Sequence, residues 1–238
     1  MTEEQLISEI KTKARPYYIN DQNLPFDDVH DWGHMQRVYG AAWEILEHEP
    51  LANRAEVLIA AILHDSGRCK DIEPHAEESF KIAKALLEPY RKDFESLNID
   101  LEKTLLIIKY HTVAHICPDE RIAKAVEFNI MTDADKIEMF GASGILRSPI
   151  AQAYKMKPVV QWSIDRINAL SEDDQFVFQS RGGKILGQKY KDYMKSFIKE
   201  LDDQYKFIDH FWLLLCLISR LRSISTPHYV KELTNAQI

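Results

Sequence analysis

The feature of this sequence that most constrains its fold is the helical spacing of its apolar residues. Apolar side chains recur at the helical period along nearly the whole chain, whereas alternating β-branched runs bounded by turn residues are almost absent. This pattern predicts an all-α protein. The expected helices cover about residues 3–14, 33–48, 53–65, 75–88, 100–112, 119–131, 134–140, 159–170, 182–202 and 204–222.

Length and composition favour one domain. The chain has 238 residues, of which 45% are hydrophobic and 28% charged, and this is the profile of a globular protein with enough material for one large core or two small ones. The sequence contains no internal repeat, low-complexity tract or Gly/Ser linker that would divide it. We therefore expect a single all-α domain over 1–238, with a helical core at about 25–150 and a C-terminal helical extension at about 151–238 that packs on the core or forms a lid.

The charge balance and the cysteines restrict partners and location. A net charge of -7 provides no broad basic field that would hold a nucleic-acid duplex or an anionic membrane. The longest apolar run, FWLLLCLI at 211–218, is too short to span a bilayer, so we expect a buried helix or a subunit contact, which leaves a homodimer open. Cys69, Cys117 and Cys216 form no CxxC motif, and the acidic N-terminus lacks a secretory pattern, so we expect a cytoplasmic protein.

Polar side chains stand at the ends of several apolar helical segments. The stretch VLIAAIL at 57–63 runs directly into His64 and Asp65, and Gly67 allows the helix to end there. Other such edges carry His30, His34, His75, His111, Asp133 and Asp135. A metal ion would stabilise carboxylates and neutral imidazoles that a protein core otherwise rejects. Because no thiolate accompanies them, the set suits one divalent Mn, Fe, Co, Ni or Zn ion, with Mg also open.

The ordered set resembles the HD superfamily of metal-dependent phosphohydrolases, whose pattern is H...HD...D spread over helices. The segments HDWGHMQRV, LHDSG and DADKIEMFGASGILR are most similar to a bacterial branch of predicted HD phosphohydrolases in which a DAD-(R/K)-L-D...G..GI..R segment is typical. The resemblance covers about residues 25–150. It implies an HD-type helical bundle that hydrolyses a phosphate ester or anhydride.

Carried over onto this chain, the resemblance implies four metal ligands, which are His34, His64, Asp65 and Asp135. The last ligand in the family is an aspartate that usually follows an alanine, which favours Asp135 over Asp133. Asp133 then supports the site or caps a helix. Glu138 departs from the family pattern, in which aspartate is usual at that place.

The number of metal ions stays open. Some HD proteins carry two further histidines between the HD pair and the last aspartate and hold two metals, and His75 and His111 occupy matching places in this sequence. The branch that the chain most resembles is usually considered mononuclear. We therefore prefer one ion, with these two histidines facing the substrate phosphate or a water, and a second metal as the alternative.

Further residues are candidates for phosphate binding and proton transfer. Arg68 lies four residues after His64 and returns to the same face if the helix continues, where it would hold phosphate oxygens. Asp65 or a neighbouring histidine such as His111 would take the proton from an attacking water. Substrate contacts are expected from His30, Arg68, His75, His111 and Lys136.

The expected activity is hydrolysis of a small-molecule phosphate, with a nucleotide as the preferred substrate. Cleavage of nucleoside triphosphates to monophosphate and pyrophosphate is one activity that the resemblance implies. Two alternatives are a di-iron oxygenase with the same fold and a noncatalytic nucleotide-binding module. Lys70 and Arg147 are further candidate cations, and we expect Arg37 to pair with a buried carboxylate.

Overall fold

The computed structural model is almost entirely helical in the part of the chain that it describes. The described residues are 1–26, 29–70, 74–113, 117–153, 165, 167, 169–170 and 178–223, and side chains after residue 147 are described only at 165, 167, 169–170, 178–201 and 203–204. These ranges contain no strand, and the one β-bridge, between Ile19 and Pro25, is isolated. The predicted all-α class is confirmed.

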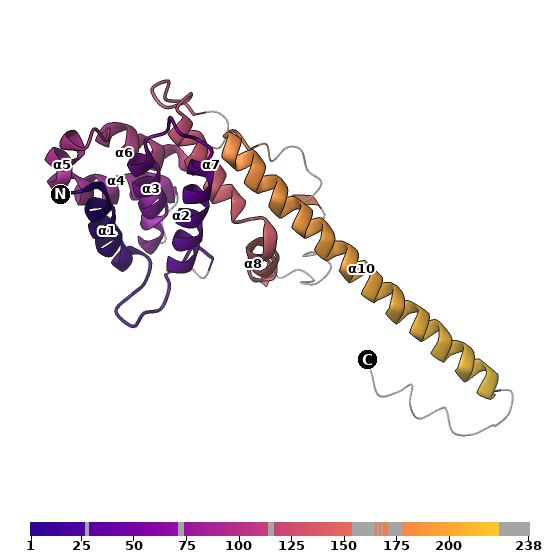
Figure 1. Ribbon diagram of the computed structural model, residues 1–238. Coiled ribbons are helices and arrows are strands. Elements are labelled where there is room, and N and C mark those ends of the chain that lie inside the picture. The colour runs from indigo at the N-terminus through magenta and orange to yellow at the C-terminus, as the bar shows by residue number, and fades with distance from the viewer. Residues whose placement is uncertain are drawn as a thin grey trace. The chain divides into compact units, whose positions relative to one another are not determined.

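The elements follow one another along the chain as shown in Figure 1. The α-helices are α1 (Glu3–Ala14), α2 (Trp32–Leu46), α3 (Arg54–Leu63), α4 (His75–Leu87), α5 (Arg91–Ser96), α6 (Leu101–Tyr110), α7 (Val126–Ile137), α8 (Gly141–Ala153) and α10 (Arg181–Ser223). The short 3₁₀ helices are η1 (Arg15–Tyr17), η2 (Ser66–Lys70), η3 (Glu88–Tyr90) and η4 (His111–Val113).

Local side-chain caps explain where several helices begin. Thr2, Asp31, Asn53 and Asp100 each precede a helix and accept a hydrogen bond from the backbone N–H three residues further on. Such a cap satisfies one of the amide groups that a helix start leaves without an intrahelical partner. The predicted starts of α1, α2, α3 and α6 therefore agree with the structure to within one residue.

Helix α3 forms the centre of the core. Every residue from 55 to 63 is buried, and the helix contacts α1, α2, α6 and α7 (Figure 1). A helix that is apolar on all sides must be surrounded by other elements. Its C-terminal end therefore lies inside the protein, and the residues that follow it, His64 and Asp65, have exposed fractions of only 0% and 2%.

The buried end of α3 is satisfied by side chains. The last carbonyl groups of a helix have no intrahelical donor and need other partners when water is absent. Nδ1 of His64 lies 2.9 Å from the carbonyl oxygen of Ala61, and the Tyr18 hydroxyl donates to the carbonyl of Ile62 at 2.7 Å. The Ser66 hydroxyl donates to the carbonyl of Leu63. Sequence reasoning identified neither Tyr18 nor Ser66 as a support of this helix end.

Two predicted helices are wrong in the region of α7. The expected helices 119–131 and 134–140 are replaced by a turn at 120–124 and one continuous helix at 126–137. The gap between the two expected helices fell at Thr132 and Asp133, whose short polar side chains compete with helical hydrogen bonding. Both are buried within the helix, and partners elsewhere in the fold satisfy Asp133.

The C-terminal part contains one long helix where the sequence predicted two. Helix α10 is continuous from Arg181 to Ser223, so the expected break at 203 is absent. Asp203 is exposed and therefore remains solvated within the helix. The expected helix 159–170 lies largely outside the described residues, as do the side chains of the apolar run 211–218.

The chain divides into two compact units, Met1–Lys195 and Ser196–Ile238, and the expectation of a single domain over 1–238 stays a prediction. Among the described helices, none combines the length and the apolar character needed to cross a bilayer.

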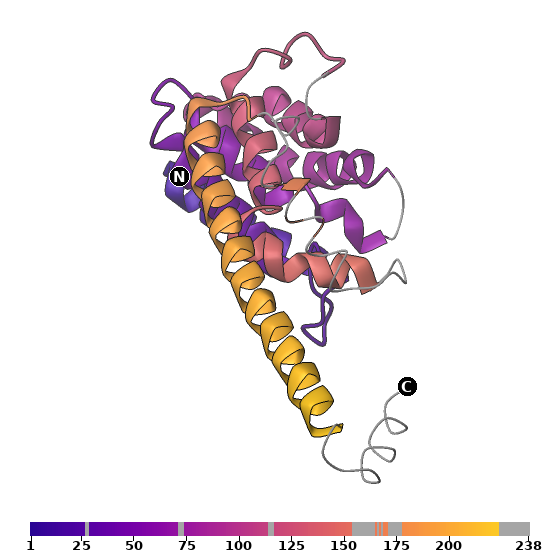
Figure 2. The ribbon, with the colours of Figure 1, turned by 90° about the vertical axis from the view of Figure 1, so that its right-hand side faces the viewer.

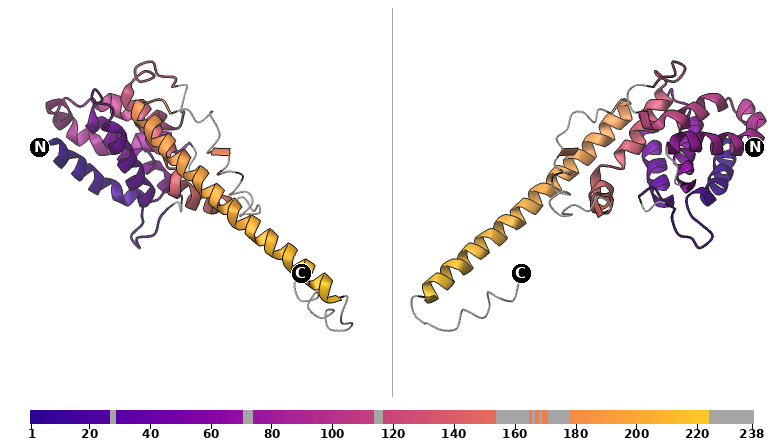
Figure 3. Two further views of the ribbon diagram at one scale, coloured as in Figure 1. Left: turned by 45° about the vertical axis from the view of Figure 1, so that its right-hand side comes forward. Right: turned by 180° about the vertical axis from the view of Figure 1, so that it is seen from behind.

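Within the first unit, the start of α10 lies against α2 and α7, as the orange ribbon shows in Figures 2 and 3. A β-carbon at Gly182 would collide with the backbone of Ile45, and one at Gly183 would collide with the carboxylate of Asp133. Glycine at these positions therefore allows the first turn of α10 to approach the core closely.

Candidate metal centre

Four polar side chains from three helical segments meet in the interior of the first unit. His34 lies in the first turn of α2, where the Asp31 cap begins the helix, and it is 1% exposed. His64 and Asp65 follow the end of α3, and Asp135 lies near the end of α7 with a side chain that is 32% exposed. The structure therefore brings together all four ligands that the sequence resemblance implied.

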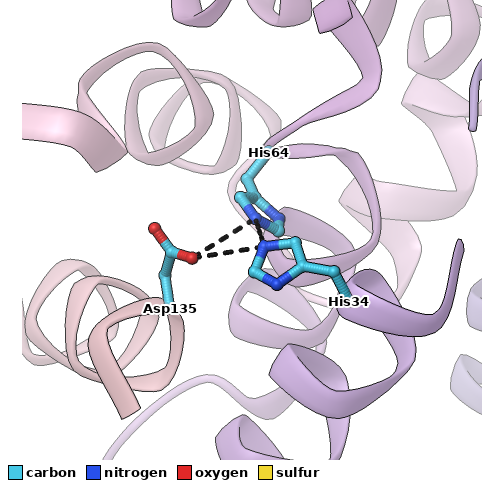
Figure 4. A group of neighbouring side chains, drawn as sticks. All are labelled: His34, His64 and Asp135. Atoms are coloured by element: carbon cyan, nitrogen blue, oxygen red, sulfur yellow. Dashed lines mark hydrogen bonds and ion pairs between the residues drawn. The ribbon is translucent and has the colours of Figure 1, made fainter. Parts of the chain in front are cut away.

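The Nε2 atoms of the two histidines lie at nearly equal distances from each other and from the two carboxylate oxygens. Nε2 of His34 is 3.3 Å from Nε2 of His64 and 3.4 Å from both Oδ2 of Asp65 and Oδ1 of Asp135. Nε2 of His64 is 3.5 Å from the same Asp65 oxygen and 3.8 Å from the same Asp135 oxygen. Figure 4 shows His34, His64 and Asp135 pointing toward one another.

This geometry fits a divalent cation. Four tetrahedral nitrogen and oxygen ligands at ~2.1 Å from an ion would lie ~3.4 Å from one another, which is close to the five observed separations. Two imidazole nitrogens and two carboxylate oxygens form a donor set without thiolate, which suits Mn²⁺, Fe²⁺, Co²⁺, Ni²⁺ or Zn²⁺. A cation at their centre would also compensate the burial of these polar groups.

The opposite ring nitrogens of the histidines are oriented by hydrogen bonds. Nδ1 of His64 faces the carbonyl of Ala61 at 2.9 Å, and Nδ1 of His111 faces the carbonyl of Ile108 at 2.7 Å. A carbonyl can only accept, so Nδ1 carries the proton in each ring and Nε2 keeps its lone pair. The first of these lone pairs points into the metal centre.

A carboxylate orients His34 in the same way. Oε2 of Glu138 is 3.5 Å from Nδ1 of His34, and it accepts hydrogen bonds from Arg37 Nε at 2.7 Å and from the Ser143 hydroxyl at 3.1 Å. The predicted pairing of Arg37 with a buried carboxylate is confirmed. Arg147 approaches the same glutamate oxygen at 3.4 Å and His34 Nδ1 at 3.3 Å. The sequence marked Glu138 only as a departure from a family pattern and did not predict its contact with His34.

The protonation of the centre reflects burial and close charges. Burial alone would lower the pKa of His34, but hydrogen bonds with Asp135, Asp65 and Glu138 raise that pKa to about 10. Burial lowers the pKa of His64 to about 4. Burial opposes the ionised form of Asp65 and Asp135, yet the surrounding histidines hold both pKa values below the ordinary range. In the metal-free chain a proton on His34 thus supplies the positive charge that a metal ion would bring.

A second group of potential ligands shares Asp65. Oδ1 of this residue is 3.2 Å from Nε2 of His75 and 3.6 Å from Nε2 of His111. All three residues are buried, and their ligand atoms lie within 4.8 Å of one another. Gly67 brings them together, because a β-carbon there would lie 2.5 Å from the backbone nitrogen of Ser79 in α4.

Arg68 lies beside this second group rather than over His64. The α-helical turn expected after His64 does not continue, because η2 forms instead and the backbone N–H of Arg68 donates to the carbonyl of Asp65. Residues three apart eclipse each other in a 3₁₀ helix. Nε of Arg68 is accordingly 3.0 Å from Oδ1 of Asp65, and Nη2 is 3.2 Å from Nε2 of His75.

The remaining candidates lie at different distances from the centre. The ring of His30 packs edge-on against His34 with centroids 5.2 Å apart. Nζ of Lys136 lies 4.0 Å from Oδ1 of Asp133, and burial lowers the pKa of this lysine. Lys70 pairs with Glu78.

Asp133 holds the start of α10. Its carboxylate is fully buried and accepts hydrogen bonds from the backbone N–H of Gln179 at 2.9 Å, the backbone N–H of Ser180 at 2.7 Å and the Ser180 hydroxyl at 2.7 Å. Ser180 in turn accepts a hydrogen bond from the N–H of Gly183. Asp133 and Asp135 are thus two residues apart on one helix but serve different partners.

Comparison with known proteins agrees with this arrangement. A family model described as the HD domain matches residues 31–139. These residues include all four members of the candidate metal centre, so the chain carries a helical metal-binding domain of the HD type. Residues 31–139 thus form an HD domain. A search of curated proteins found no match.

Several solved structures share the fold over most of the chain. The Lin1889 protein from Listeria innocua is 21% identical with a TM-score of 0.61, and the match covers 87% of this chain and 98% of that one. Bacillus subtilis YpgQ in complex with ADP is 20% identical with a TM-score of 0.58, covering 86% and 97%. A predicted HD superfamily hydrolase from an uncultured Thermotogales bacterium is 20% identical with a TM-score of 0.56, covering 86% and 99%. At these identities the likeness shows the fold.

Proposed function

We propose that this protein is a metal-dependent phosphohydrolase that cleaves a phosphate ester or anhydride bond in a nucleotide. The observation that carries the proposal is the convergence of His34, His64, Asp65 and Asp135, in which each histidine Nε2 lies 3.3–3.8 Å from the other ligand atoms. We propose these four residues as the ligands of one divalent ion, with Mn²⁺ as the first ion to test. When bound, such an ion lowers the pKa of a water and polarises a phosphoryl oxygen.

The protein groups around the ion would orient the ligands and balance charge. Glu138 would accept a hydrogen bond from the Nδ1–H group of His34 and thereby direct Nε2 toward the ion. Arg37 would fix the position of Glu138. Arg68 would stabilise charge that develops on the phosphate, since a guanidinium binds phosphate oxygens through fixed N–H groups.

Proton transfer is proposed for His111 and Asp65. Burial works to lower the pKa of His111, but the hydrogen bond with Asp65 outweighs it and the pKa is raised. Nε2 of this ring lies 3.6 Å from Oδ1 of Asp65 and, when protonated, could pass its proton to the leaving oxygen. Asp65 would accept the proton of the attacking water.

A nucleotide is the proposed substrate class. The related fold of Bacillus subtilis YpgQ was solved in complex with ADP, which supports a nucleotide without identifying the base or the chain length. We propose His30, His75 and Lys136 as additional substrate contacts, because the first two lie beside the centre and the third follows Asp135 directly. Cys69 and Cys117 are free thiols, which is compatible with the proposed cytoplasmic location.

A nucleotide hydrolysis screen tests the proposal. Purified protein would be analysed for metal, then incubated with nucleoside mono-, di- and triphosphates and Mn²⁺, Mg²⁺, Co²⁺ or Ni²⁺, with separate detection of phosphate and pyrophosphate. We expect hydrolysis by the wild type, none by His64→Ala, and wild-type rates for His48→Ala, whose histidine follows the C-terminal end of α2. Metal binding without turnover of any nucleotide would favour the noncatalytic nucleotide-binding module, and failure to bind any divalent ion would refute the proposal.

The di-iron oxygenase is the less favoured reading. It requires a second ion on Asp65, His75 and His111, whereas the guanidinium of Arg68 already contacts the first two of these groups.

A further inference from the structure

The second ligand group has the composition of a metal site. Asp65, His75 and His111 contribute one carboxylate oxygen and two imidazole nitrogens, all buried and within 4.8 Å of one another. The group shares Asp65 with the first centre, since Oδ2 faces His34 and His64 while Oδ1 faces the second group. A carboxylate in this position could bridge two ions. The question is what neutralises Oδ1 in this protein.

Arg68 already contacts two of the three ligand atoms. Its Nε lies 3.0 Å from Oδ1 of Asp65, and its Nη2 lies 3.2 Å from Nε2 of His75. A guanidinium cannot lose its proton in a protein and only donates hydrogen bonds. Its positive charge therefore lies beside two of the three atoms that a second metal ion would need as ligands.

The local fold holds the guanidinium in this place. The 3₁₀ helix η2 places Arg68 over Asp65, and the close approach at Gly67 brings α4 with His75 against it. The Arg68 side chain is 20% exposed, so most of it is enclosed by these elements.

On the basis of the proposed metal centre, we infer that Arg68 takes the place of a second metal ion and restricts the centre to one ion. The guanidinium places a permanent positive charge 3.0 Å from Oδ1 of Asp65 and 3.2 Å from Nε2 of His75. A second divalent ion would have to displace it and would meet its repulsion at close range. His111, the third member of the second group, lies with its Nε2 3.6 Å from the same Oδ1.

Metal stoichiometry tests this inference without measuring turnover. Protein stripped with a chelator would be dialysed against Mn²⁺, and bound metal would be measured by elemental analysis together with electron paramagnetic resonance, which separates an isolated Mn²⁺ from an exchange-coupled pair. We expect one isolated ion per chain in the wild type and two coupled ions in Arg68→Gln. Lys70→Gln is the matched control, because Lys70 lies in the same 3₁₀ helix but pairs with Glu78, and it should still bind one ion.

The double variant Arg68→Gln/His75→Ala should return to one ion, because it lacks a ligand of the second group. Two coupled ions in the wild type, or one ion in a folded Arg68→Gln variant, would overturn the inference while leaving the proposed hydrolase intact. No bound ion in the wild type would refute the proposed metal centre itself. If Arg68→Gln does not give a native circular dichroism spectrum, Arg68→Met serves as the second neutral variant, and the wild-type spectrum still decides between one ion and a pair.

Discussion

The different roles assigned to Asp133 and Asp135 provide the sharpest test of the site. These aspartates are separated by one alanine on α7, and the family resemblance favours Asp135 as the metal ligand. We predict that Asp135→Ala abolishes metal retention, because it removes one of the four converging ligands. We predict that Asp133→Ala keeps the metal but destabilises the fold, because it removes the acceptor that holds the start of α10.

The size of the stability loss follows from the donors that Asp133→Ala would leave behind. Ser180 is buried, so its N–H and its hydroxyl would both lose their acceptor away from water, whereas the N–H of the exposed Gln179 can turn to solvent. An unsatisfied buried donor costs about 1–3 kcal/mol. Burial raises the pKa of Asp133, so removing a buried carboxylate returns part of this cost. We therefore expect a net loss of about 2–4 kcal/mol in the free energy of unfolding.

Both variants would be examined by urea unfolding in the presence of a chelator and by elemental analysis after loading with Mn²⁺. Asp133→Asn is the control for shape, because it keeps one acceptor oxygen but places an amide near the N–H of Ser180, and its stability should fall between wild type and Asp133→Ala. Metal lost from folded Asp133→Ala, together with metal retained by Asp135→Ala, would reverse the assignment of the two residues and refute this reasoning.

Three further predictions concern the surroundings of the centre. Gly67→Ala should lower the free energy of unfolding by about 1–3 kcal/mol, measured with urea, because its β-carbon has no room against α4, and unchanged stability would contradict the close approach. Glu138→Gln should weaken metal affinity about 10–100-fold in a competition titration, and unaltered affinity would show that the glutamate does not support His34. In the metal-free chain, hydrogen bonds with carboxylates outweigh burial and raise the pKa of His34 from 6.5 to about 10. The contribution of protonated His34 to the free energy of unfolding is therefore complete below pH 6.5 and is lost as the pH rises to 10. His34→Gln should flatten this decline in urea unfolding at different pH values, and an equal decline in both proteins would contradict the prediction.

Local physical chemistry made much of the fold predictable. The period of the apolar residues indicated the all-α class, and caps such as Asp31 and Asn53 set helix starts through hydrogen bonds within one turn. The errors arose where distant partners override local preference. Asp133 resembles a helix end in the sequence but lies inside α7, because Ser180, 47 residues away, satisfies its carboxylate.

The sequence by itself determined the all-α class and the resemblance to the HD superfamily pattern, because both depend on residue types at characteristic spacings. Only the tertiary structure decided which side chains share a point in space. It placed Asp135 rather than Asp133 beside His34, set Glu138 behind that histidine, and turned Arg68 toward Asp65. The reason is physical: a metal centre requires ligand atoms from separate helices to meet within a few ångströms, and that meeting depends on how the helices pack and where each one ends.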